Sequence, residues 1–380
     1  MQTILITKFF AQKVYGSYGF YVSLSQIILI STQWGFTSWG VNELTKLDKS
    51  NLTDLFNGII ISKFIIGGIT FILLVTYIIV DTGQIDIALI FAFLFYYLSL
   101  VFSLEIMYIS LSKIENMLKI SLFSKIIYTI IFAYILLVYR VTPQWLFMLF
   151  AIQGILNSLF LYVNQSDFKI KFSLFRSKID QTILNSSSNF ILVFSSFLFA
   201  SGPVIYSGHF LSKDAFAVVY ASTAIIKLIQ ASYQPMIQKI LPKLNRGLSI
   251  AMDVKLSLLF AFIASTVLFI AAPFIVKIIF NDNYIGIVPA IRLFSLSIIP
   301  GILSTIIISQ WAIYANKIRL VYVFVVLIAL INFIIFTIYS SSLNWQIIIW
   351  SMLLSELALF FIVFIILLIT ERPLTLKFNR

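Results

Sequence analysis

The chain has 380 residues, of which 61% are hydrophobic and only 11% are charged, and its formal net charge is +12. A globular domain has about 45–50% apolar and about 25% charged residues, because charged side chains keep its surface in contact with water. So few charges cannot cover a folded body of this length with polar groups. The composition therefore excludes a soluble globular protein and predicts an integral membrane protein.

Long apolar stretches recur along the whole chain. In a helix, about 20 apolar residues rising 1.5 Å each cross the roughly 30 Å hydrocarbon core of a bilayer. Runs such as FILLVTYIIV (71–80) lack the alternation of a β-barrel strand. We therefore predict an all-α membrane protein with about twelve transmembrane helices. Their expected ranges are 1–11, 18–40, 58–80, 87–110, 117–138, 144–163, 181–205, 214–235, 256–280, 289–313, 320–340 and 345–370.

Basic residues are concentrated in alternate loops. If the N-terminus is cytoplasmic, the outer loops hold only Lys13, Arg140 and Lys213. An excess of lysine and arginine in cytoplasmic loops is the usual topology signal of membrane proteins. The positive charge therefore indicates that both termini are cytoplasmic, and it does not indicate a nucleic-acid-binding patch. The inner loops and tail hold Lys46, Lys49, Lys113, Lys119, Lys169, Lys171, Arg176, Lys178, Lys239, Lys243, Arg246, Lys255, Lys317, Arg319, Arg372, Lys377 and Arg380.

The longest polar connection is basic and has six predicted segments on either side. We predict an N-terminal six-helix lobe over 1–165, a cytoplasmic linker over 166–180 and a C-terminal six-helix lobe over 181–380. A central linker between two equal halves is typical of two-lobed transporters. The segment 1–11 is shorter than a full span, so we expect a first helix that is cut short.

Catalytic patterns are missing from the sequence. The chain has no cysteine, and its single histidine, His209, falls in a short predicted loop. It has no glycine-rich phosphate loop, paired-carboxylate motif or metal-ligand spacing. The predicted outer loops are also too short for a catalytic domain outside the membrane. We therefore expect no enzyme activity, no catalytic residues, no bound metal and no cofactor.

Charged residues inside the apolar segments give the strongest indication of a functional site. Such a charge costs about 2.5–3.5 kcal/mol at a helix centre, so it normally faces a bundle interior or an aqueous cavity. Because the cations outnumber the anions, carboxylates in the membrane cannot neutralise them all. A cavity lined in this way would attract an anionic substrate, such as one with a pyrophosphate. The cations are Lys8, Lys63, Lys125, Lys227, Lys277 and Arg292, and the anions are Glu105 and Glu356.

Depth in the membrane separates these charges further. Lys63, Glu105 and Lys125 lie at similar depths in the first half and would form one network if their helices turn those faces together. Lys277 and Arg292 lie near the outer ends of their segments. For these two, extension of the charged group to the headgroups is the alternative to a place in a cavity.

Two features of the second half also have a purely structural alternative. Lys227 and Glu356 both lie near mid-membrane and could form a structural ion pair. Gln181, Asn185 and Asn189 recur at every fourth residue and therefore share one helix face. That polar stripe could line a substrate path, or it could join helices through hydrogen bonds.

Several motifs in the second half occur in a fixed order. Within 271–333, a proline-containing helix is followed by a short turn with a tyrosine and then by a proline and an arginine. A glutamine, the basic loop YANKIRL and a late glutamate come next. These residues are Pro273, Phe280, Tyr284, Pro289, Arg292, Ser295, Gln310 and Glu356.

Other matching features extend the pattern over nearly the whole chain. They are Lys13, Gly16, Tyr18, Gly35 and Glu43 at the front, Glu115 and Met117 in SLSKIENM, and Tyr220, Lys227 and Pro242 around the eighth segment. In their order and spacing they resemble the polysaccharide-export flippases. These are the Wzx-type translocases of O-antigen or repeat units, which belong to the multidrug/oligosaccharidyl-lipid/polysaccharide exporter superfamily.

The resemblance implies two six-helix lobes around a central cavity, in a bacterial cytoplasmic (inner) membrane. It implies that an undecaprenyl-pyrophosphate-linked oligosaccharide moves from the inner to the outer leaflet, with membrane lipids and polysaccharide polymerase and chain-length proteins as partners. Lys63, Lys125 and Lys227 would receive the pyrophosphate and glycan by alternating access. Because family transport is thought to use ion exchange, Glu105 or Glu356 is the candidate for ion coupling.

Three other functions fit parts of this pattern. A multidrug exporter of the same superfamily would need acidic residues in its cavity to bind cationic drugs. In the predicted segments of this chain, basic residues outnumber acidic ones. A membrane glycan polymerase or ligase is disfavoured by the short outer loops. A peptidoglycan-precursor flippase usually has more than twelve helices.

Overall fold

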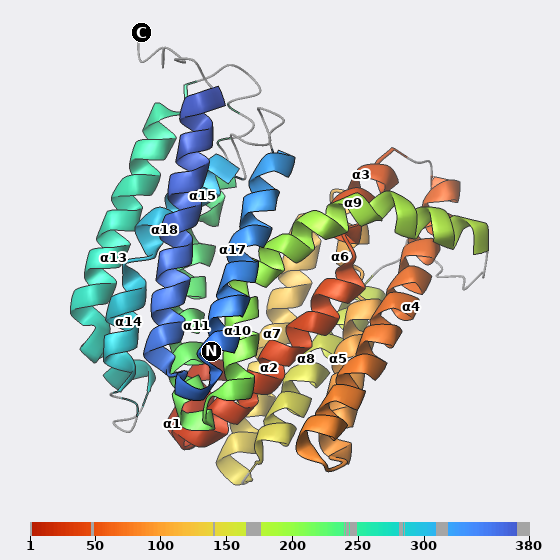
Figure 1. Cartoon of the computed structure of the whole chain (residues 1–380). Helices are drawn as coiled ribbons and strands as arrows, with labels where there is room; N and C mark the ends of the chain where they lie inside the picture. The colour runs from red at the N-terminus through yellow and green to blue at the C-terminus, as the bar shows by residue number, and fades with distance from the viewer. Residues whose placement is uncertain are drawn as a thin grey trace. The chain divides into compact units, whose positions relative to one another are not determined.

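The computed structural model of the chain describes residues 2–46, 49–139, 141–164, 176–238, 240, 243, 249–280, 284, 286–308 and 318–370 (Figure 1). Helices account for the regular secondary structure of these residues, and no strand occurs among them. The predicted all-α class is therefore confirmed for the described part of the chain. Gln310, Pro242, the loop YANKIRL up to Lys317 and residues 166–175 of the predicted linker lie outside it.

Two compact units divide the chain. Unit 1 comprises Met1–Phe9 and Ser17–Phe197, and unit 2 comprises Phe10–Gly16 and Leu198–Arg380. Helices α2 and α9 each contribute residues to both units. The predicted six-plus-six division with a linker at 166–180 stays a prediction.

In unit 1, α8 packs against α5 and α7, α4 packs against α5, and α3 contacts both α4 and α6. The helices that contribute to unit 1 are α1 (Gln2–Phe9), α2 (Gln12–Gln33), α3 (Phe36–Leu44), α4 (Lys49–Thr82), α5 (Ile87–Val101), α6 (Glu105–Ser110), α7 (Ile114–Val138), α8 (Pro143–Val163) and α9 (Arg176–Ala200).

In unit 2, α13 packs against α14 and α15, and α18 packs against α15 and α17. The α-helices of this unit are α10 (Gly202–Phe210), α11 (Lys213–Gln238), α13 (Ala251–Ile279), α14 (Ile287–Ser295), α15 (Ile298–Ile306), α17 (Ile318–Ile338) and α18 (Trp345–Thr370). A 3₁₀ turn, Ser340–Ser342, joins the last two.

Nine spans of the described chain are long and apolar enough to cross a membrane, or ten if the two halves of α9 count as one bent span. These spans overlap the predicted segments from 58–80 onward, with 181–205 represented by the bent helix. The first two predicted segments correspond to α1, which has only eight residues, and to α2, which is not among the nine. The total of twelve therefore stays a prediction.

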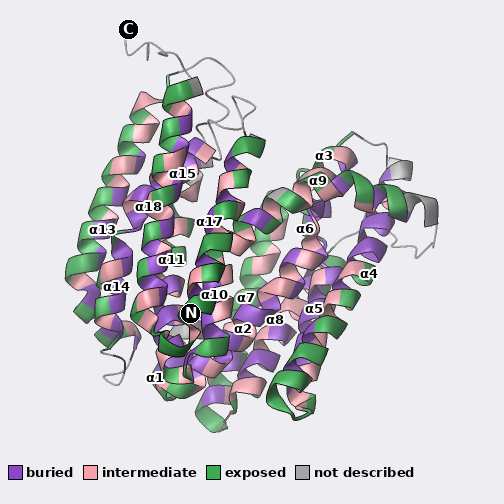
Figure 2. Ribbon diagram, in the orientation of Figure 1, coloured by how far each residue is buried: buried purple, intermediate pink, exposed green. Residues whose placement is uncertain are grey.

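Long helices expose apolar side chains on their outer faces. Figure 2 shows exposed stripes along α7 and α13, and only 22% and 28% of the residues in their most apolar windows are buried. Exposed residues include Leu122 and Ile130 on α7 and Phe262 and Phe274 on α13. Soluble proteins rarely expose contiguous apolar patches of this extent. The pattern is that of helices with one face toward the protein and one toward lipid.

The segment before α2 and the start of that helix are anchored within unit 2. The Gln12 amide donates a hydrogen bond to the Asp214 carbonyl oxygen at 2.8 Å, and the Tyr284 hydroxyl donates to the Phe10 carbonyl oxygen at 3.1 Å. The Tyr15 ring lies 5.4 Å from that of Tyr220. Burial, with a smaller contribution from Asp214, raises the pKa of the Tyr284 phenol, which therefore remains a hydrogen-bond donor at neutral pH.

Candidate functional site

A polar cavity of about 200 Å³ lies inside unit 1. Four parts of the chain line it: the corner between α2 and α3, helix α4, the break between α5 and α6, and helix α8. Its lining residues are Leu29, Thr32, Gln33, Thr37, Lys63, Tyr96, Ser99, Leu100, Ser103, Glu105, Ile106, Gly154, Asn157 and Ser158. For a place inside an apolar bundle, this set is rich in hydroxyl, amide and charged groups.

Lys63 is the most buried charged group of this cavity, with 4% of its surface exposed. Its Nζ donates a long hydrogen bond of 3.5 Å to the Leu100 carbonyl oxygen. Among the described residues, no carboxylate oxygen lies within 4 Å of Nζ, so Glu105 acts on it from a greater distance. Lys63 is thus a buried cation whose charge is not neutralised by direct contact.

The span Ile87–Ser110 breaks between α5 and α6, and donors from other helices explain the break. Ser158 Oγ donates to the Ser99 carbonyl oxygen at 3.0 Å, and Lys63 occupies the next carbonyl, that of Leu100. The Ser103 amide donates to Leu100 instead of Ser99. A side chain that inserts into the backbone hydrogen-bond ladder is a recognised cause of a kink. The ammonium group consequently lies at the carbonyl end of α5, where the helix dipole favours a cation.

Two buried polar atoms of the cavity have no hydrogen-bond partner. They are Oγ1 of Thr32, a residue with 1% of its surface exposed, and Oδ1 of Asn157. Buried polar groups are paired in most native structures, because an unpaired one costs about 1–3 kcal/mol. The unpaired atoms therefore indicate that this cavity receives water or a polar ligand group.

The corner between α2 and α3 is fixed by a left-handed glycine. Gly35 has φ +72°, and a Cβ at this position would lie 2.7 Å from the Phe190 nitrogen of α9. Trp34 stacks on the Phe190 ring at 3.9 Å. On the predicted polar stripe of α9, Asn189 is half-buried beside Gly35, whereas Gln181 and Asn185 are exposed.

Other predicted residues of unit 1 lie outside the cavity. Lys125 is exposed on α7 and is not among the lining residues, so Lys63 and Glu105 share the cavity without it. Lys8 is exposed on α1. The roles predicted for Lys125 and Lys8 stay predictions.

In unit 2, Lys227 and Glu356 line one small pocket of about 50 Å³ together with Gln230 and Thr223. Although both charged residues are described, they are not within ion-pair distance of each other. The Glu356 carboxylate lies next to Gly301 of α15, whose carbonyl oxygen accepts a hydrogen bond from Ser304 Oγ at 3.1 Å. The alternative of a direct structural ion pair is therefore not observed.

A buried hydrogen-bond network adjoins Glu356. Asn332 of α17 donates to Ser355 Oγ at 2.8 Å, and Ser351 donates to Asn332 Oδ1 at 2.8 Å. Ser355 also donates to the Ser351 carbonyl oxygen at 2.7 Å. This network joins α17 to α18 and fixes the part of α18 that carries the glutamate.

The remaining predicted cations of unit 2 are exposed. Arg292 donates from Nε to the Phe269 carbonyl oxygen at 3.3 Å, and its guanidinium lies 5.7 Å from the centre of the Phe269 ring. Lys277 is exposed on α13. Neither residue lines the pocket of Lys227 and Glu356.

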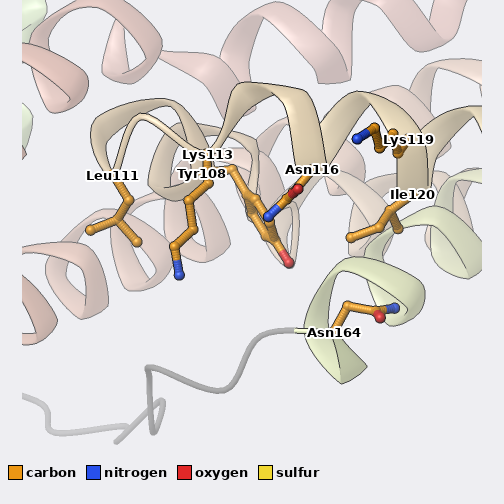
Figure 3. Close-up of a pocket in the computed structure, with 7 residues that line it drawn as sticks. All are labelled: Tyr108, Leu111, Lys113, Asn116, Lys119, Ile120 and Asn164. Carbon is orange, nitrogen blue, oxygen red and sulfur yellow. The ribbon is translucent and has the colours of Figure 1, made fainter.

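A third cavity, of about 300 Å³, lies at the start of α7 (Figure 3). It adjoins the turn between α6 and α7 and the end of α8. Its lining residues are Tyr108, Leu111, Lys113, Asn116, Lys119, Ile120 and Asn164.

Sequence reasoning missed Thr32, Asn157, Ser158 and Asn332, because it followed charges and one polar stripe. In each case, the available signal was an uncharged polar residue inside an apolar segment.

Within the residues that the structure describes, no group of three or more acidic or histidine side chains could hold a metal ion. No protein-family model, curated protein or solved structure matches the chain.

Proposed function

We propose that the chain is a flippase. It would move an undecaprenyl-pyrophosphate-linked oligosaccharide from the inner to the outer leaflet of a bacterial cytoplasmic membrane, for the synthesis of a surface polysaccharide such as O-antigen or capsule. The motif resemblance supplies the substrate class. The observation that carries the proposal is Lys63, a cation with 4% of its surface exposed, in a cavity among apolar helices and without direct contact to a carboxylate of the described residues.

An anionic ligand gives such a lysine a favourable role. A charge within the bilayer costs about 2.5–3.5 kcal/mol on insertion scales and is usually paired or functional. A phosphate oxygen would replace the long contact to Leu100 with a charge-assisted hydrogen bond, which is shorter and stronger. Pyrophosphate therefore fits Lys63 better than a cationic drug does.

The other polar groups of the cavity suit the glycan. Thr32 and Asn157 contribute the unpaired oxygen atoms, and Ser103 is a further lining hydroxyl. Hydroxyl and amide groups both donate and accept hydrogen bonds, as sugar hydroxyls do. In this proposal, Lys63 receives the pyrophosphate, and these groups contact the sugar next to it.

The second half of the transport cycle is assigned to unit 2. Lys227 is the predicted cation there, and Glu356 is the candidate for ion coupling, with Glu105 as the alternative in unit 1. Glu356 lies in a pocket with Lys227 but is not within ion-pair distance of it. Binding and release of a coupling ion at Glu356 would therefore not require an ion pair with Lys227 to break. By alternating access, Lys63, Lys125 and Lys227 would receive the pyrophosphate and glycan from the cytoplasmic side and would then be exposed to the outer side.

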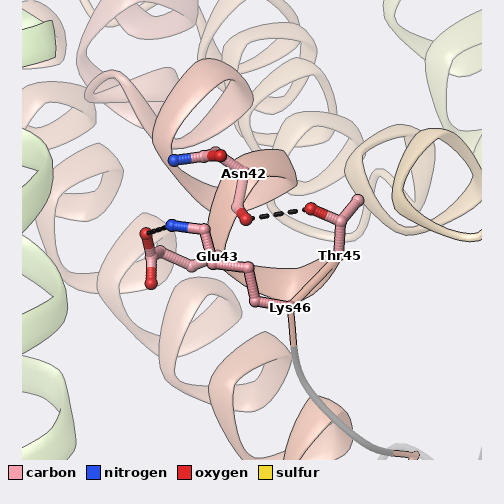
Figure 4. Close-up of polar contacts among 4 residues, drawn as sticks. All are labelled: Asn42, Glu43, Thr45 and Lys46. Carbon is pink, nitrogen blue, oxygen red and sulfur yellow. Dashed lines mark hydrogen bonds and ion pairs between the residues drawn. The ribbon is translucent and has the colours of Figure 1, made fainter.

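Reconstituted transport tests the proposal. Purified protein in liposomes should move a labelled pyrophosphate-linked oligosaccharide lipid between leaflets, and K63Q, K125Q and K227Q should each lose at least tenfold in rate. The matched control is K46Q, because Lys46 is an exposed lysine that pairs with Glu43 at 2.8 Å and lies outside all three cavities (Figure 4).

The same assay separates the rival functions. Full transport by the three lysine variants would contradict the lysine assignment. Polymerised or ligated glycan in place of translocated single units would identify an enzyme. Uptake of cationic drugs without any movement of the glycolipid would identify a multidrug exporter.

A further inference from the structure

Helix α11 carries a polar stripe along one face of an apolar span. Its residues are Tyr220, Thr223, Lys227, Gln230 and Gln234, and the intervals between them alternate between three and four residues. Side chains at these intervals lie one above another on the same face of a helix. The small pocket of unit 2 confirms this for the middle of the stripe, because Thr223, Lys227 and Gln230 all line it. These five residues are called the α11 stripe below.

The two ends of the α11 stripe differ in how their polar groups are satisfied. At one end, Thr223 is buried, and its hydroxyl donates a hydrogen bond to the Tyr220 carbonyl oxygen at 2.9 Å. At the other end, Lys227 is exposed, and Gln230 and Gln234 are half-buried. These three side chains make no hydrogen bond or ion pair with the described part of the chain. They form the open end of the stripe.

The open end needs water or a polar ligand. It lies within Lys213–Gln234, a span that is long and apolar enough to cross a membrane. Hydrocarbon offers no hydrogen bonds, so unsatisfied amides and charges are costly there. Glutamines that join helices have partners on a neighbouring helix, and Gln230 and Gln234 have none among the described residues. The open end therefore faces a water-filled path and not lipid.

The chemistry of the open end suits an anionic group followed by sugars. Lys227 supplies one positive charge, and Gln230 and Gln234 supply uncharged amides that both donate and accept hydrogen bonds, as sugar hydroxyls do. At 1.5 Å per residue, the helix rises about 10 Å from Lys227 to Gln234, which exceeds the length of one sugar ring. The open end can therefore contact more than one sugar beside an anion at Lys227.

We propose that the α11 stripe is the glycan-binding surface of unit 2, and that Gln230 and Gln234 select the sugars next to the pyrophosphate. This inference rests on the proposed function, which assigns the pyrophosphate to Lys227, and adds the residues that recognise the sugars there. A glycan without a hydroxyl at the matching position would cover an amide and leave it unpaired, which lowers affinity. The two glutamines therefore discriminate among glycans as well as bind them.

Cysteine accessibility tests whether the open end faces water. The chain has no cysteine, so Q230C and Q234C each have a single thiol. A water-soluble maleimide should label both variants in liposomes, because the reactive form of a thiol is the charged thiolate. The matched control is L259C, since Leu259 is 55% exposed on α13 and, like Gln230, lies eight residues from the helix end that the charge pattern places in the cytoplasm. L259C should react only after denaturation.

Affinities for two lipids test whether the ligand is the glycan. The probes are the repeat-unit glycolipid extracted from the cells that produce this protein and undecaprenyl pyrophosphate without sugar. Native mass spectrometry of the full-length protein measures the binding of each. Q230M and Q234M should bind the glycolipid about three- to tenfold more weakly and the sugar-free lipid as wild type does, because methionine keeps the length but lacks the amide. K227Q should weaken the binding of both lipids.

Protection from labelling links the two measurements. The bound glycolipid should slow labelling of Q234C severalfold, whereas undecaprenyl pyrophosphate should not. Three results would overturn the assignment: labelling of Q230C and Q234C no faster than that of L259C, equal weakening of both lipids by the glutamine variants, or unchanged affinity for both.

Failure of this inference is distinguishable from failure of the proposed function. Translocation of the glycolipid by the wild-type protein, with unchanged affinities in Q230M and Q234M, would overturn the glycan contacts alone. A glycan-selective loss of affinity in these variants, without translocation by the wild-type protein, would support the glycan contacts and contradict the proposed transport. Absence of binding of either lipid to the wild-type protein would overturn both.

Discussion

The Lys63 ammonium lies 3.5 Å from the carbonyl oxygen of Leu100, at the point where one membrane-spanning helix stops and a shorter one begins. This contact holds a cation inside an apolar bundle, and no carboxylate of the described part of the chain contacts it directly. It is also longer than the 2.7–3.2 Å typical of N–H···O hydrogen bonds. The lysine is therefore held in position but is incompletely satisfied, which leaves it available to an anion.

Replacement of Lys63 by methionine should separate function from stability. We expect K63M to lose translocation at least tenfold, yet to unfold in detergent at the same temperature as wild type or a higher one. The reason is that burial of a charge without an ion pair costs free energy, which an apolar side chain of similar length does not incur. Thermal unfolding by intrinsic fluorescence, measured beside the transport assay, checks both parts. A strongly destabilised K63M would mean that the lysine is mainly structural.

The unpaired hydroxyl of Thr32 leads to a second prediction. Valine has nearly the same shape as threonine, with a methyl group in place of the hydroxyl. T32V therefore removes an unsatisfied buried polar group and should not lower the free energy of unfolding. Affinity for the glycan-bearing lipid should nevertheless fall about three- to tenfold, whereas affinity for undecaprenyl pyrophosphate without sugar should stay the same. Equal effects on both lipids would contradict the assignment of Thr32 to the sugar.

Gly35 and Gly83 form a matched pair for a third prediction. Both have positive φ, +72° and +65°, but only Gly35 faces other atoms, among them Phe190 N and Ser186 O. A left-handed conformation costs a residue with a Cβ about 1–2 kcal/mol. We expect G83A to lose about that much and G35A to lose several kcal/mol or to fail to fold. The amount of monodisperse protein obtained and its unfolding temperature measure the difference. Equal losses in the two variants would show that the backbone between α2 and α3 can shift to accommodate a Cβ.

The break between α5 and α6 shows why part of the site could not be predicted. The stretch 87–110 has neither proline nor glycine, so it is predicted as one helix. It is broken by donors from elsewhere in the chain, Ser158 and Lys63, that occupy its carbonyl groups. Helical periodicity describes the faces of a single helix and carries no information about which neighbouring side chain will insert into it.

The charged residues show which part of the candidate site can be predicted from the sequence and which part cannot. Their similar depth in apolar segments predicts one network of Lys63, Glu105 and Lys125 only if the three helices turn those faces together, because charges in a bilayer usually face water or one another. The exclusion of Lys125 from the cavity of Lys63 and Glu105 depends on the rotation of α7 about its axis. That rotation is set by packing against α8 and is not encoded in the spacing of the charges.

Asn332 provides a fourth prediction, through its bonds to two serines of α18. A double-mutant cycle with N332A and S351A should give a coupling of about 0.6 kcal/mol and at most about 1.7 kcal/mol, the mean and the maximum found for hydrogen bonds between membrane helices. N332A alone should be the more damaging variant, because it removes the bonds of Asn332 to both Ser351 and Ser355, although Ser355 keeps its bond to the Ser351 carbonyl oxygen. Unfolding in a mixed-detergent titration measures these values. Additive effects would mean that the hydrogen bond does not couple the helices.

Glu356 leads to the last prediction, which concerns ion coupling. Its carboxylate lies against Gly301, where even a Cβ would come within 3.6 Å of Oε2. Glutamine keeps the shape and the hydrogen-bond acceptor but cannot bind or release a proton or compensate a cation. If Glu356 couples transport, E356Q should still exchange glycolipid between leaflets down its concentration gradient and should no longer respond to an imposed proton or sodium gradient.

Half-buried Glu43 serves as the control for this experiment, because E43Q removes a carboxylate whose ion pair with Lys46 lies outside the pocket of Glu356 (Figure 4). E43Q should retain the full gradient response. The parallel variant E105Q distinguishes the two candidates, since only the coupling residue should uncouple transport when it is neutralised. A gradient response that survives in E356Q and is lost in E105Q would move the coupling site to unit 1. There, Glu105 shares a cavity with Lys63, and coupling would then act directly on the cation that receives the pyrophosphate.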